Sequence, residues 1–554
     1  MDEPPVTGSA GAPPTNASLA DRLLLFAALL ELGDADPFAA RAYRRAADVI
    51  RSTPAPVAAL VAAGRARELR GIGPGIEARL RELVETGEIA ELGRLEAALR
   101  PDLVGLGRMI GLTAGRTLAI ARALGVADAE GFREAAAAGR LREAPGVGPV
   151  TERRILAALA SPPEPPRGLT LNRSRALLRG IAAALGGEIA GEPRRFCELS
   201  RHLAVVCAAS DPAPVLRAFD AHPSVVTVLE RAGRRAVGVT VEGVPVELIV
   251  AEPTRFGTAL VRATGSADYV AALEPLPEAP DEQSFYRALG LPWQPPELRE
   301  APLRSSPPRL VEVDDVRGDL HCHTAWSDGR ATVLEMAAAA RARGYEYLAV
   351  CDHTPSVGVV TGLSADDLRR QAGEIAAVNE RLAPFRVLRG VECDILPDGS
   401  LDAPADVLGE LDWVQISLHA GQRRPGPELT KIVCEAMRRP HVSALSHPKG
   451  RILNHRPENA LDLDAVFEAA LETGVALEVN GLPDRLDLSG EHVRGAVAAG
   501  VSLVVSSDAH STAGLANLEL AVATARRGGA GPGAIVNTRG LAQLLSLRRS
   551  RARS

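Results

Sequence analysis

The sequence predicts a multidomain protein of α and α/β class that ends in an α/β barrel or parallel sheet. The chain has 554 residues, too many for one core at roughly 150 residues per domain. Its first part carries apolar residues at three- and four-residue steps, which predicts helices. Its last part alternates short apolar runs with Ala-rich segments, which is typical of parallel strands joined by helices.

Bulk composition narrows the class of protein. The net charge of −6 gives no general signal for nucleic acid, so any such binding must come from local patches. The six cysteines occur singly, which favours a reducing cytoplasm over a disulfide framework. The apolar run 23–32 is too short to span a bilayer and no secretory cleavage pattern is present, so we expect no membrane partner.

The N-terminal part predicts a tail followed by helices with glycine-rich turns. Residues 1–17 have the composition of a disordered tail, and a helical pattern runs from about 19 to 98. Two turns, LRGIGPGI and APGVGP, each open a helix, and a degenerate copy lies within 103–123. Such glycines let the backbone approach a phosphate at a helix N-terminus, although ordinary turn punctuation is the alternative. The candidate DNA-binding residues are Gly71, Gly73, Gly75, Gly146 and Gly148.

The middle of the chain predicts a small α+β unit between two proline-rich connectors at 161–166 and about 293–308. A helix is expected over 172–185. The expected strands are 203–207, 225–229, 236–241 and 244–250.

Beyond Arg317, polar blocks follow the apolar runs expected to be strands. The runs are 347–350, 386–388, 413–416, 442–445, 475–479 and 501–505. Nine of the eleven histidines follow residue 320. Because the C-terminal ends of parallel strands meet at one mouth of a barrel, we expect these side chains to converge. Imidazole and carboxylate suit Zn²⁺, Mn²⁺ or Fe²⁺, and the nine candidate groups are enough for two or three ions.

The motifs GDLHCHTAWSDG, AVCDH, RGVECD, ISLH, LSHPKGR and SSDAHS resemble those of PHP domains, over roughly residues 317–530. The resemblance implies a distorted (β/α)₇ barrel that hydrolyses phosphoesters with three metal ions. One ion would take His321, His323, Glu392 and Asp508. A second would take Glu392, His419 and His447, and a third Asp328, His353 and His510. Catalysis would depend on Glu392, Asp508 and His353, and Arg451 would contact a substrate phosphate.

With ATGS at 263–266 and YRALGLPWQPPELRE at 286–300, the layout resembles the bacterial family X DNA polymerases of PolX type. These place a DNA polymerase beta-like body before a PHP domain. The resemblance implies the following division: tail 1–17, helix–hairpin–helix domain 18–98, second, fingers-like helix–hairpin–helix domain 99–165, palm-like nucleotidyltransferase domain 166–252, thumb-like domain 253–300, linker 301–316 and PHP domain 317–554.

The polymerase site departs from that family's pattern. The two metal-binding aspartates of that family align with His202 and Ala204 of this chain, and the family's third carboxylate aligns with Glu247. Because two-metal phosphoryl transfer needs several oxygen ligands around Mg²⁺, we expect no polymerisation. A sugar-phosphate lyase needs a lysine, and none precedes Lys431.

The function expected is therefore a metal-dependent phosphoesterase that acts on DNA, as a 3′–5′ exonuclease or 3′-end-processing enzyme in repair. Its partner would be DNA ends, gaps or single-stranded 3′ tails, and its location the cytoplasm, at the nucleoid. Three alternatives stay open: a small-molecule phosphatase of the histidinol phosphatase kind, a residual DNA polymerase and a non-catalytic scaffold that binds DNA ends.

Overall fold

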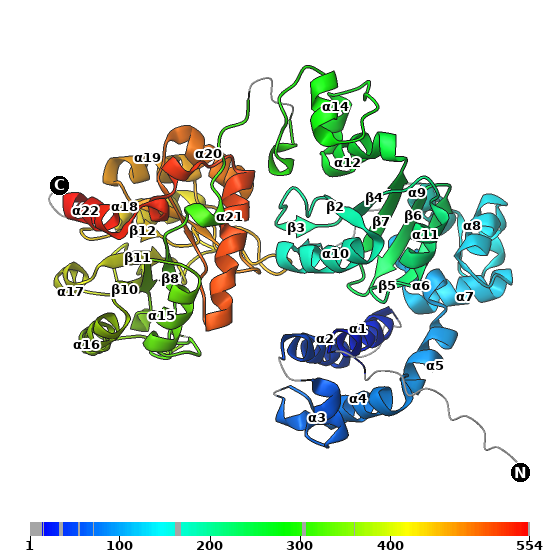
Figure 1. Ribbon diagram of the computed structural model, residues 1–554, viewed down its shortest axis with the longest axis horizontal. Helices are drawn as coiled ribbons and strands as arrows, with labels where there is room; N and C mark the ends of the chain where they lie inside the picture. Colours follow the sequence, from blue (N-terminus) through cyan, green and yellow to red (C-terminus); the bar gives the residue numbers. More distant parts are fainter. Residues whose placement is uncertain are drawn as a thin grey trace, which may run out of the picture. The chain divides into compact units, whose positions relative to one another are not determined.

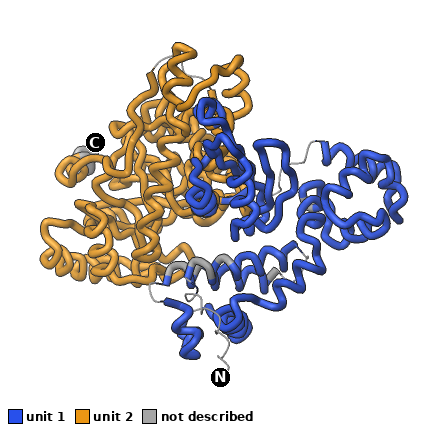
Figure 2. The backbone as a smooth tube through the Cα atoms, turned by 45° about the vertical axis from the view of Figure 1, so that its right-hand side comes forward, with its two compact units in different colours: residues 1–169, 177–189, 201–259 blue, residues 170–176, 190–200, 260–554 orange. Residues whose placement is uncertain are grey.

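The computed structural model describes residues 14, 16–32, 37–53, 56–69, 71–160, 168–301, 306–358 and 360–551. Most of the expected disordered tail and the whole connector 161–166 lie outside these residues. Two compact units make up the chain (Figure 2). The first contains residues 1–169, 177–189 and 201–259, and the second contains 170–176, 190–200 and 260–554. No helix in the described ranges combines the length and apolar character needed to cross a bilayer.

The first unit begins with a series of helices (Figure 1). They are α1 (Asn16–Leu32), α2 (Pro37–Ser52), α3 (Val57–Ala62), α4 (Pro74–Thr86), α5 (Ala90–Leu99), α6 (Pro101–Met109), α7 (Ala114–Leu124), α8 (Ala129–Ala137) and α9 (Pro149–Ala160). The glycine-rich turns lie just before α4 and α9. Gly71 and Gly146 have φ of 98° and 78°, a left-handed conformation that favours glycine. Pro74 opens α4, where its missing N–H costs no hydrogen bond.

A five-stranded mixed sheet follows, with strand order β2-β4-β7-β6-β5. Its strands are β2 (Gly187–Gly191), β4 (Leu203–Ala208), β5 (Val225–Ala232), β6 (Arg235–Thr240) and β7 (Pro245–Ala251). Along the chain, the other elements before, between and after these strands are β1 (Leu169–Thr170), α10 (Leu171–Leu185), β3 (Leu199–Ser200), α11 (Ala213–Asp220), α12 (Phe256–Thr264), α13 (Ala267–Ala271) and α14 (Glu282–Ala288). The four expected strands are present, whereas β2 was not expected.

The C-terminal part is a nearly closed barrel of seven parallel strands in the order β14-β13-β12-β11-β10-β9-β8. The strands are β8 (Gly318–Cys322), β9 (Tyr347–Val350), β10 (Arg386–Asp394), β11 (Trp413–Ser417), β12 (Ala444–Leu445), β13 (Ala476–Asn480) and β14 (Leu503–Ser506). Just beyond the strand ends, Asp508 N donates to His321 O at 3.0 Å and His323 N donates to Ala509 O at 2.8 Å. These bonds join the two edges of the sheet.

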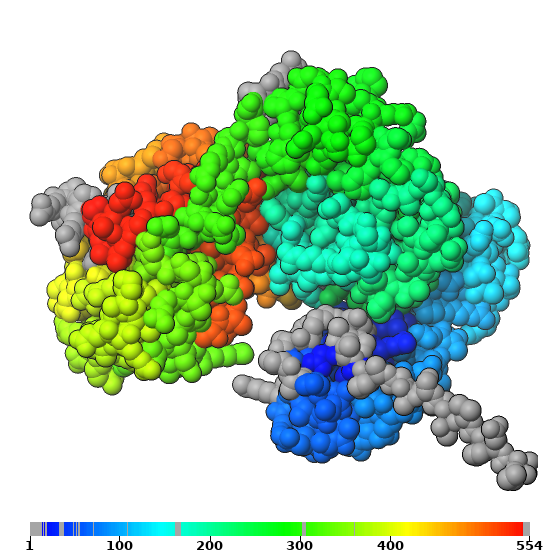
Figure 3. All heavy atoms as spheres, in the orientation of Figure 1, coloured from blue at the N-terminus to red at the C-terminus, as the bar shows by residue number. Residues whose placement is uncertain are grey.

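Helices surround the barrel and separate its strands along the chain. They are α15 (Val333–Ala342), α16 (Ala365–Leu382), α17 (Ala405–Glu410), α18 (Gly426–Met437), α19 (Leu463–Thr473), α20 (Gly490–Ala499), α21 (Leu518–Arg527) and α22 (Leu541–Arg551). Every residue of β8, β9, β11 and β14 is buried, and Figure 3 draws the heavy atoms of one face of the molecule. Four of these helices, α15, α16, α19 and α20, begin at side-chain caps, such as Thr332 with Glu335 at α15, that satisfy the first backbone N–H groups.

Alternating side chains of the strands build two apolar layers. In β9, Leu348 and Val350 pack with the outer helices. Tyr347 and Ala349 pack in a second cluster with Leu544 of α22. This inner cluster fills the barrel with carbon atoms, so polar groups collect at the strands' C-terminal ends.

Candidate metal centre

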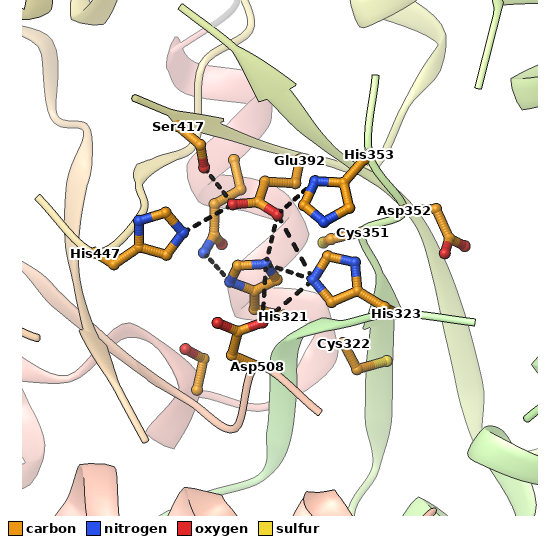
Figure 4. Close-up of polar contacts among 12 residues, drawn as sticks. His321, Cys322, His323, Cys351, Asp352, His353, Glu392, Ser417, His447 and Asp508 are labelled. Atoms are coloured by element: carbon orange, nitrogen blue, oxygen red, sulfur yellow. Dashed lines mark hydrogen bonds and ion pairs between the residues drawn. The ribbon is translucent and has the colours of Figure 1, made fainter. Parts of the chain in front are cut away.

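The nine expected ligands lie at the C-terminal ends of the barrel strands. Two lie within strands, His321 in β8 and Glu392 in β10, and the others lie in the segments that follow: His323 and Asp328 after β8, His353 after β9, His419 after β11, His447 after β12, and Asp508 and His510 after β14. Figure 4 shows several of these side chains pointing toward one another. The convergence expected from the sequence is therefore present.

The pair His321 and His323 shares one side of its strand because successive side chains alternate. Their Nε2 atoms lie 3.2 Å apart. Asp508 Oδ1 lies 3.2 Å from His323 Nε2 and 3.9 Å from His321 Nε2. Together the three side chains form a group whose donor atoms all lie within 4.8 Å of one another.

Glu392 lies between two sets of imidazoles (Figure 4). Its Oε2 is 3.1 Å from His353 Nδ1 and 3.4 Å from His321 Nε2. Its Oε1 is 2.9 Å from His447 Nε2 and 3.5 Å from His419 Nε2. The two oxygens thus face different imidazoles, which is the arrangement that a bridging carboxylate requires.

A further group of donors surrounds Asp328. Its Oδ2 lies 3.1 Å from His510 Nε2 and 3.7 Å from His353 Nε2. Its Oδ1 lies 3.6 Å from His323 Nδ1. The group Asp328, His323, His353 and His510 again has its donor atoms within 4.8 Å of one another. His323 and His353 therefore stand between neighbouring groups.

Charges in the cluster compensate one another at the cost of burial. Burial by itself would raise the pKa of Glu392, but the imidazoles of His353, His321 and His419 hold that pKa well below its usual range. Burial likewise opposes ionisation of His510, yet Asp328 and Asp508 raise its pKa to about 9. The cluster therefore holds ionised carboxylates beside imidazoles in a largely dehydrated space.

Divalent metal ions fit this donor set. The side chains of His321, His323 and Glu392 are at most 1% exposed, and two ring nitrogens face each other at 3.2 Å. Nδ1 of His323, His353 and His447 is buried without a hydrogen-bond partner among the described residues. Buried imidazoles and carboxylates with lone pairs directed at a common point are the ligands of Zn²⁺, Mn²⁺ and Fe²⁺.

Two candidate ligands have unusual backbone conformations. His447 and Asp508 have φ of 24° and 51°. A side-chain-bearing residue in this region costs on the order of 1–3 kcal/mol, and such residues cluster at functional sites. The fold therefore tolerates backbone strain at these two residues, whose side chains belong to the cluster.

Three polar residues at the site were missed from the sequence. Glu478 Oε1 lies 2.7 Å from His321 Nδ1, and Asp394 Oδ1 lies 2.8 Å from His419 Nδ1. Each carboxylate orients an imidazole. The third is Arg485, whose Nε lies 3.9 Å from Asp508 Oδ2. Glu478 gave a signal, since it is an acid inside an apolar run.

The carboxylates of Asp319 and Asp352 accept hydrogen bonds from groups other than the imidazoles of the cluster. Asp319 Oδ1 accepts from the backbone N of His321 and of Ser507, at 3.3 and 3.2 Å. Asp352 accepts from Thr324 N at 2.8 Å and from Gln371 Nε2 at 2.6 Å. In Figure 4, Asp352 points away from the histidines. Both carboxylates hold backbone segments around the cluster.

Comparison with known proteins identifies the family of this chain. The chain is 32% identical over 552 residues to "DNA polymerase/3′-5′ exonuclease PolX" of Bacillus subtilis (strain 168), and the match covers 93% of this chain and 96% of that protein. The chain belongs to the PolX family. A PHP domain model matches residues 319–480 and a helix-hairpin-helix domain model matches 14–89.

Other relatives of this PolX family member match a smaller share of the chain. A "Probable phosphatase" of Acetivibrio thermocellus is 32% identical over 201 residues, covering 35% of this chain and 78% of that protein. A "Probable phosphatase" of Photobacterium profundum is 32% identical over 216 residues, covering 36% of this chain and 81% of that protein.

The three positions that the sequence led us to expect opposite the family's polymerase carboxylates lie in or next to the five-stranded sheet. Ala204 of β4 pairs in parallel register with Glu247 of β7, and His202 immediately precedes β4. The Glu247 carboxylate forms an ion pair with Arg235 of the neighbouring strand. The sheet thus presents one carboxylate at these three positions, and that carboxylate has a partner.

The expected phosphate and DNA contacts lie as follows. Arg451 is buried and donates to the backbone carbonyls of Arg485 and Leu486 and to Glu458. At Gly71, Gly73, Gly75 and Gly148 an added Cβ would meet no atom within 4 Å, so these backbones border open space. At Gly146 the Arg116 guanidinium lies 3.0 Å from that position. Phosphate binding at these residues stays a prediction.

Proposed function

We propose that this chain is a metal-dependent nuclease that hydrolyses phosphodiester bonds of DNA, as a 3′–5′ exonuclease or 3′-end-processing enzyme in DNA repair. The convergence of nine imidazole and carboxylate side chains at the barrel mouth carries the proposal. The full-length similarity to a protein named DNA polymerase/3′-5′ exonuclease supports DNA as the substrate. The glycine-rich turns before α4 and α9 support binding of the DNA phosphate backbone.

Two or three divalent ions, Zn²⁺, Mn²⁺ or Fe²⁺, would be held by the sets expected from the sequence. When bound, such ions lower the pKa of water and neutralise charge on a phosphoryl group. The chain supplies their positions. Glu392 presents one oxygen to each of two donor sets, and Asp394 fixes the ring of His419 through its Nδ1. Glu392, Asp508 and His353 are the residues on which we expect hydrolysis to depend.

We further propose that the polymerase-like body binds DNA and has lost nucleotidyl transfer. His202, Ala204 and Glu247 cannot supply the oxygen ligands that two Mg²⁺ ions need. The Arg235 ion pair occupies the one remaining carboxylate. The work of this body would then be to hold DNA in the cytoplasm, at the nucleoid, for the barrel to hydrolyse.

One assay tests both proposals. A 5′-labelled primer annealed to a longer template is incubated with purified protein, Mn²⁺ and all four deoxynucleotides. We expect products shorter than the primer and none longer. EDTA or the substitution His353→Ala should lower the amount of shortened primer by a factor of at least about 100. The exposed Glu468 on α19 provides the control variant, Glu468→Gln, which should act as wild type does.

The same assay distinguishes the alternatives. Extended products that Glu247→Ala abolishes would contradict loss of polymerisation. Intact primer together with release of phosphate from histidinol phosphate would favour a small-molecule phosphatase, an activity that the match to probable phosphatases supports. Intact primer with tight, salt-sensitive binding would favour a non-catalytic scaffold.

A further inference from the structure

Arg485 stands beside the candidate metal centre in the segment that follows β13. Its Nε lies 3.9 Å from Asp508 Oδ2. That oxygen also accepts a hydrogen bond from Asn480 Nδ2 at 3.0 Å, while Asp508 Oδ1 faces His323 Nε2 at 3.2 Å. The guanidinium therefore lies on the side of Asp508 opposite the histidines, next to a proposed ligand.

The guanidinium of Arg485 has unused donors. The separation of 3.9 Å from Asp508 is longer than a hydrogen bond. Nη1 is buried and has no hydrogen-bond partner among the described residues, although the side chain as a whole keeps 19% of its surface exposed. A guanidinium offers five N–H groups in a planar fork that matches two oxygens of a phosphate. A phosphate oxygen that meets the exposed part of this side chain would supply an acceptor for the guanidinium.

Arg451 fixes the backbone that carries Arg485. Arg451 Nε donates to Arg485 O at 3.0 Å, and Nη2 donates to Leu486 O. Nη1 donates to Glu458 Oε1 at 3.2 Å. All three nitrogens of Arg451 are thus engaged within the protein. Its geometry suits a positioning residue for Arg485, and leaves Arg485 as the arginine that reaches the metal centre.

Two more arginines extend the positive charge away from the centre. Partial burial lowers the pKa of Arg456, and the positive charges of Arg485 and Arg423 lower it further against the opposing effect of Asp487. Leu453 N donates to Asp484 O at 2.7 Å, and a Cβ added at Gly450 would meet the side chain of Gln422, so the segments that carry the three arginines adjoin. Arg456 Nε donates to Gly450 O at 2.8 Å, and Arg423 is exposed. Repelling cations gain stability when an anion lies among them.

We infer that Arg485, Arg456 and Arg423 form a phosphate track for a DNA strand. Arg485 binds the phosphate that is hydrolysed, and Arg456 and Arg423 bind the next phosphate along the strand. This inference rests on the proposed nuclease function and adds the residues that would bind two adjacent phosphates of its substrate. A small ester with one phosphate engages Arg485 alone.

The test compares two substrates and two binding sites. The substrates are a single-stranded oligonucleotide and thymidine 5′-(p-nitrophenyl phosphate), which has one phosphate. Arg485→Gln should raise KM about 10- to 100-fold for both, as expected for loss of a charge-assisted hydrogen bond. Arg423→Gln should raise KM several-fold for the oligonucleotide and leave the small ester unchanged. Arg485→Lys should recover part of the loss, since a lysine keeps the charge without the fork.

A binding measurement gives a readout independent of turnover. Fluorescence anisotropy of an oligonucleotide with a hydrolysis-resistant 3′ phosphorothioate is followed against salt concentration. Each lost contact should reduce the slope of log affinity against log salt by about 0.7. The matched control is Arg341→Gln, an exposed arginine in the last turn of α15, where the chain returns to the opposite end of the barrel. It should leave the slope unchanged.

Three results would overturn the inference. The first is an Arg485→Gln protein whose KM for both substrates equals that of the wild type. The second is an Arg423→Gln protein with an unaltered salt slope. The third is loss of bound metal in Arg485→Gln, measured by elemental analysis, because Arg485 would then serve to hold Asp508. A wild type that binds the oligonucleotide but hydrolyses neither substrate would instead remove the proposed function.

Discussion

At the scale of single residues, the cluster depends on carboxylates that aim imidazoles. Glu478 is fully buried on β13. Its Oε1 lies 2.7 Å from His321 Nδ1, and its Oε2 accepts from His447 N at 2.7 Å. Burial would raise the pKa of Glu478, but His321 outweighs it and lowers that pKa. One ionised side chain thus holds a ring and a backbone segment of two different candidate ligands.

Replacing Glu478 by glutamine should weaken metal binding. Glutamine keeps the volume but removes the charge that holds His321, and loss of such a partner typically reduces metal affinity 10- to 100-fold. The measurement is a titration of the apoprotein with Zn²⁺ against a competing chelator. Glu468→Gln, exposed on α19, is the control. Equal affinities of Glu478→Gln and wild type would show that Glu478 serves only to pack the barrel.

At the scale of elements, strand ends were predictable and their side-chain partners were not. The apolar run 413–416 predicted β11 closely, and the blocks after the runs predicted that nine imidazole and carboxylate side chains would converge. This succeeded because strand periodicity and barrel topology are local and general. Glu478 and Arg485 were missed because their importance depends on neighbours that only the closed barrel brings together. β2 was missed since its Gly187–Gly191 sequence carries little apolar signal.

The element α14 is anchored through a buried ion cluster. Glu282 accepts from Arg194 Nη1 at 2.6 Å and from Arg299 Nη2 at 3.0 Å, and the Arg299 side chain is fully buried. Burial would raise the pKa of Glu282, but hydrogen bonds from Arg299 and Arg194 lower it to about 2.

Glu282→Gln should loosen α14 in a pH-dependent way. Removing the charge leaves two guanidiniums without their partner, at a cost of about 3–5 kcal/mol. Since the folded pKa lies below the unfolded value of 4.5, the stabilisation is present above pH 4.5 and is lost as the pH falls toward 2. Hydrogen exchange of α14 measures the opening free energy. The difference in opening free energy between the variant and the wild type should narrow below pH 4.5. The control Gln283→Ala, at an exposed position, should have the wild-type opening free energy at every pH. A constant gap would exclude ionised Glu282 as the cause.

At the scale of the whole molecule, the family match joins DNA-binding features in the first unit to a hydrolytic site in the second. The helix-hairpin-helix match covers 14–89 and the PHP match covers 319–480. The net charge of −6 makes the whole chain a poor general DNA binder. Affinity for DNA must then come from local sites, and the glycine-rich turns are the proposed ones. Chemistry and substrate capture should therefore respond separately to substitution.

The double variant Gly73→Asp, Gly148→Asp tests this separation. Neither glycine has positive φ and an added Cβ meets no atom within 4 Å at either, so the fold should tolerate both changes. Each carboxylate would repel a phosphate at a helix N-terminus. We expect DNA affinity to fall at least tenfold and the salt slope to drop by about one to two, while hydrolysis of thymidine 5′-(p-nitrophenyl phosphate) stays at the wild-type rate. Gly93→Asp on α5, equally open, is the control for added charge. If the double variant matched that control in DNA affinity, the turns would be structural punctuation and another surface would bind the strand.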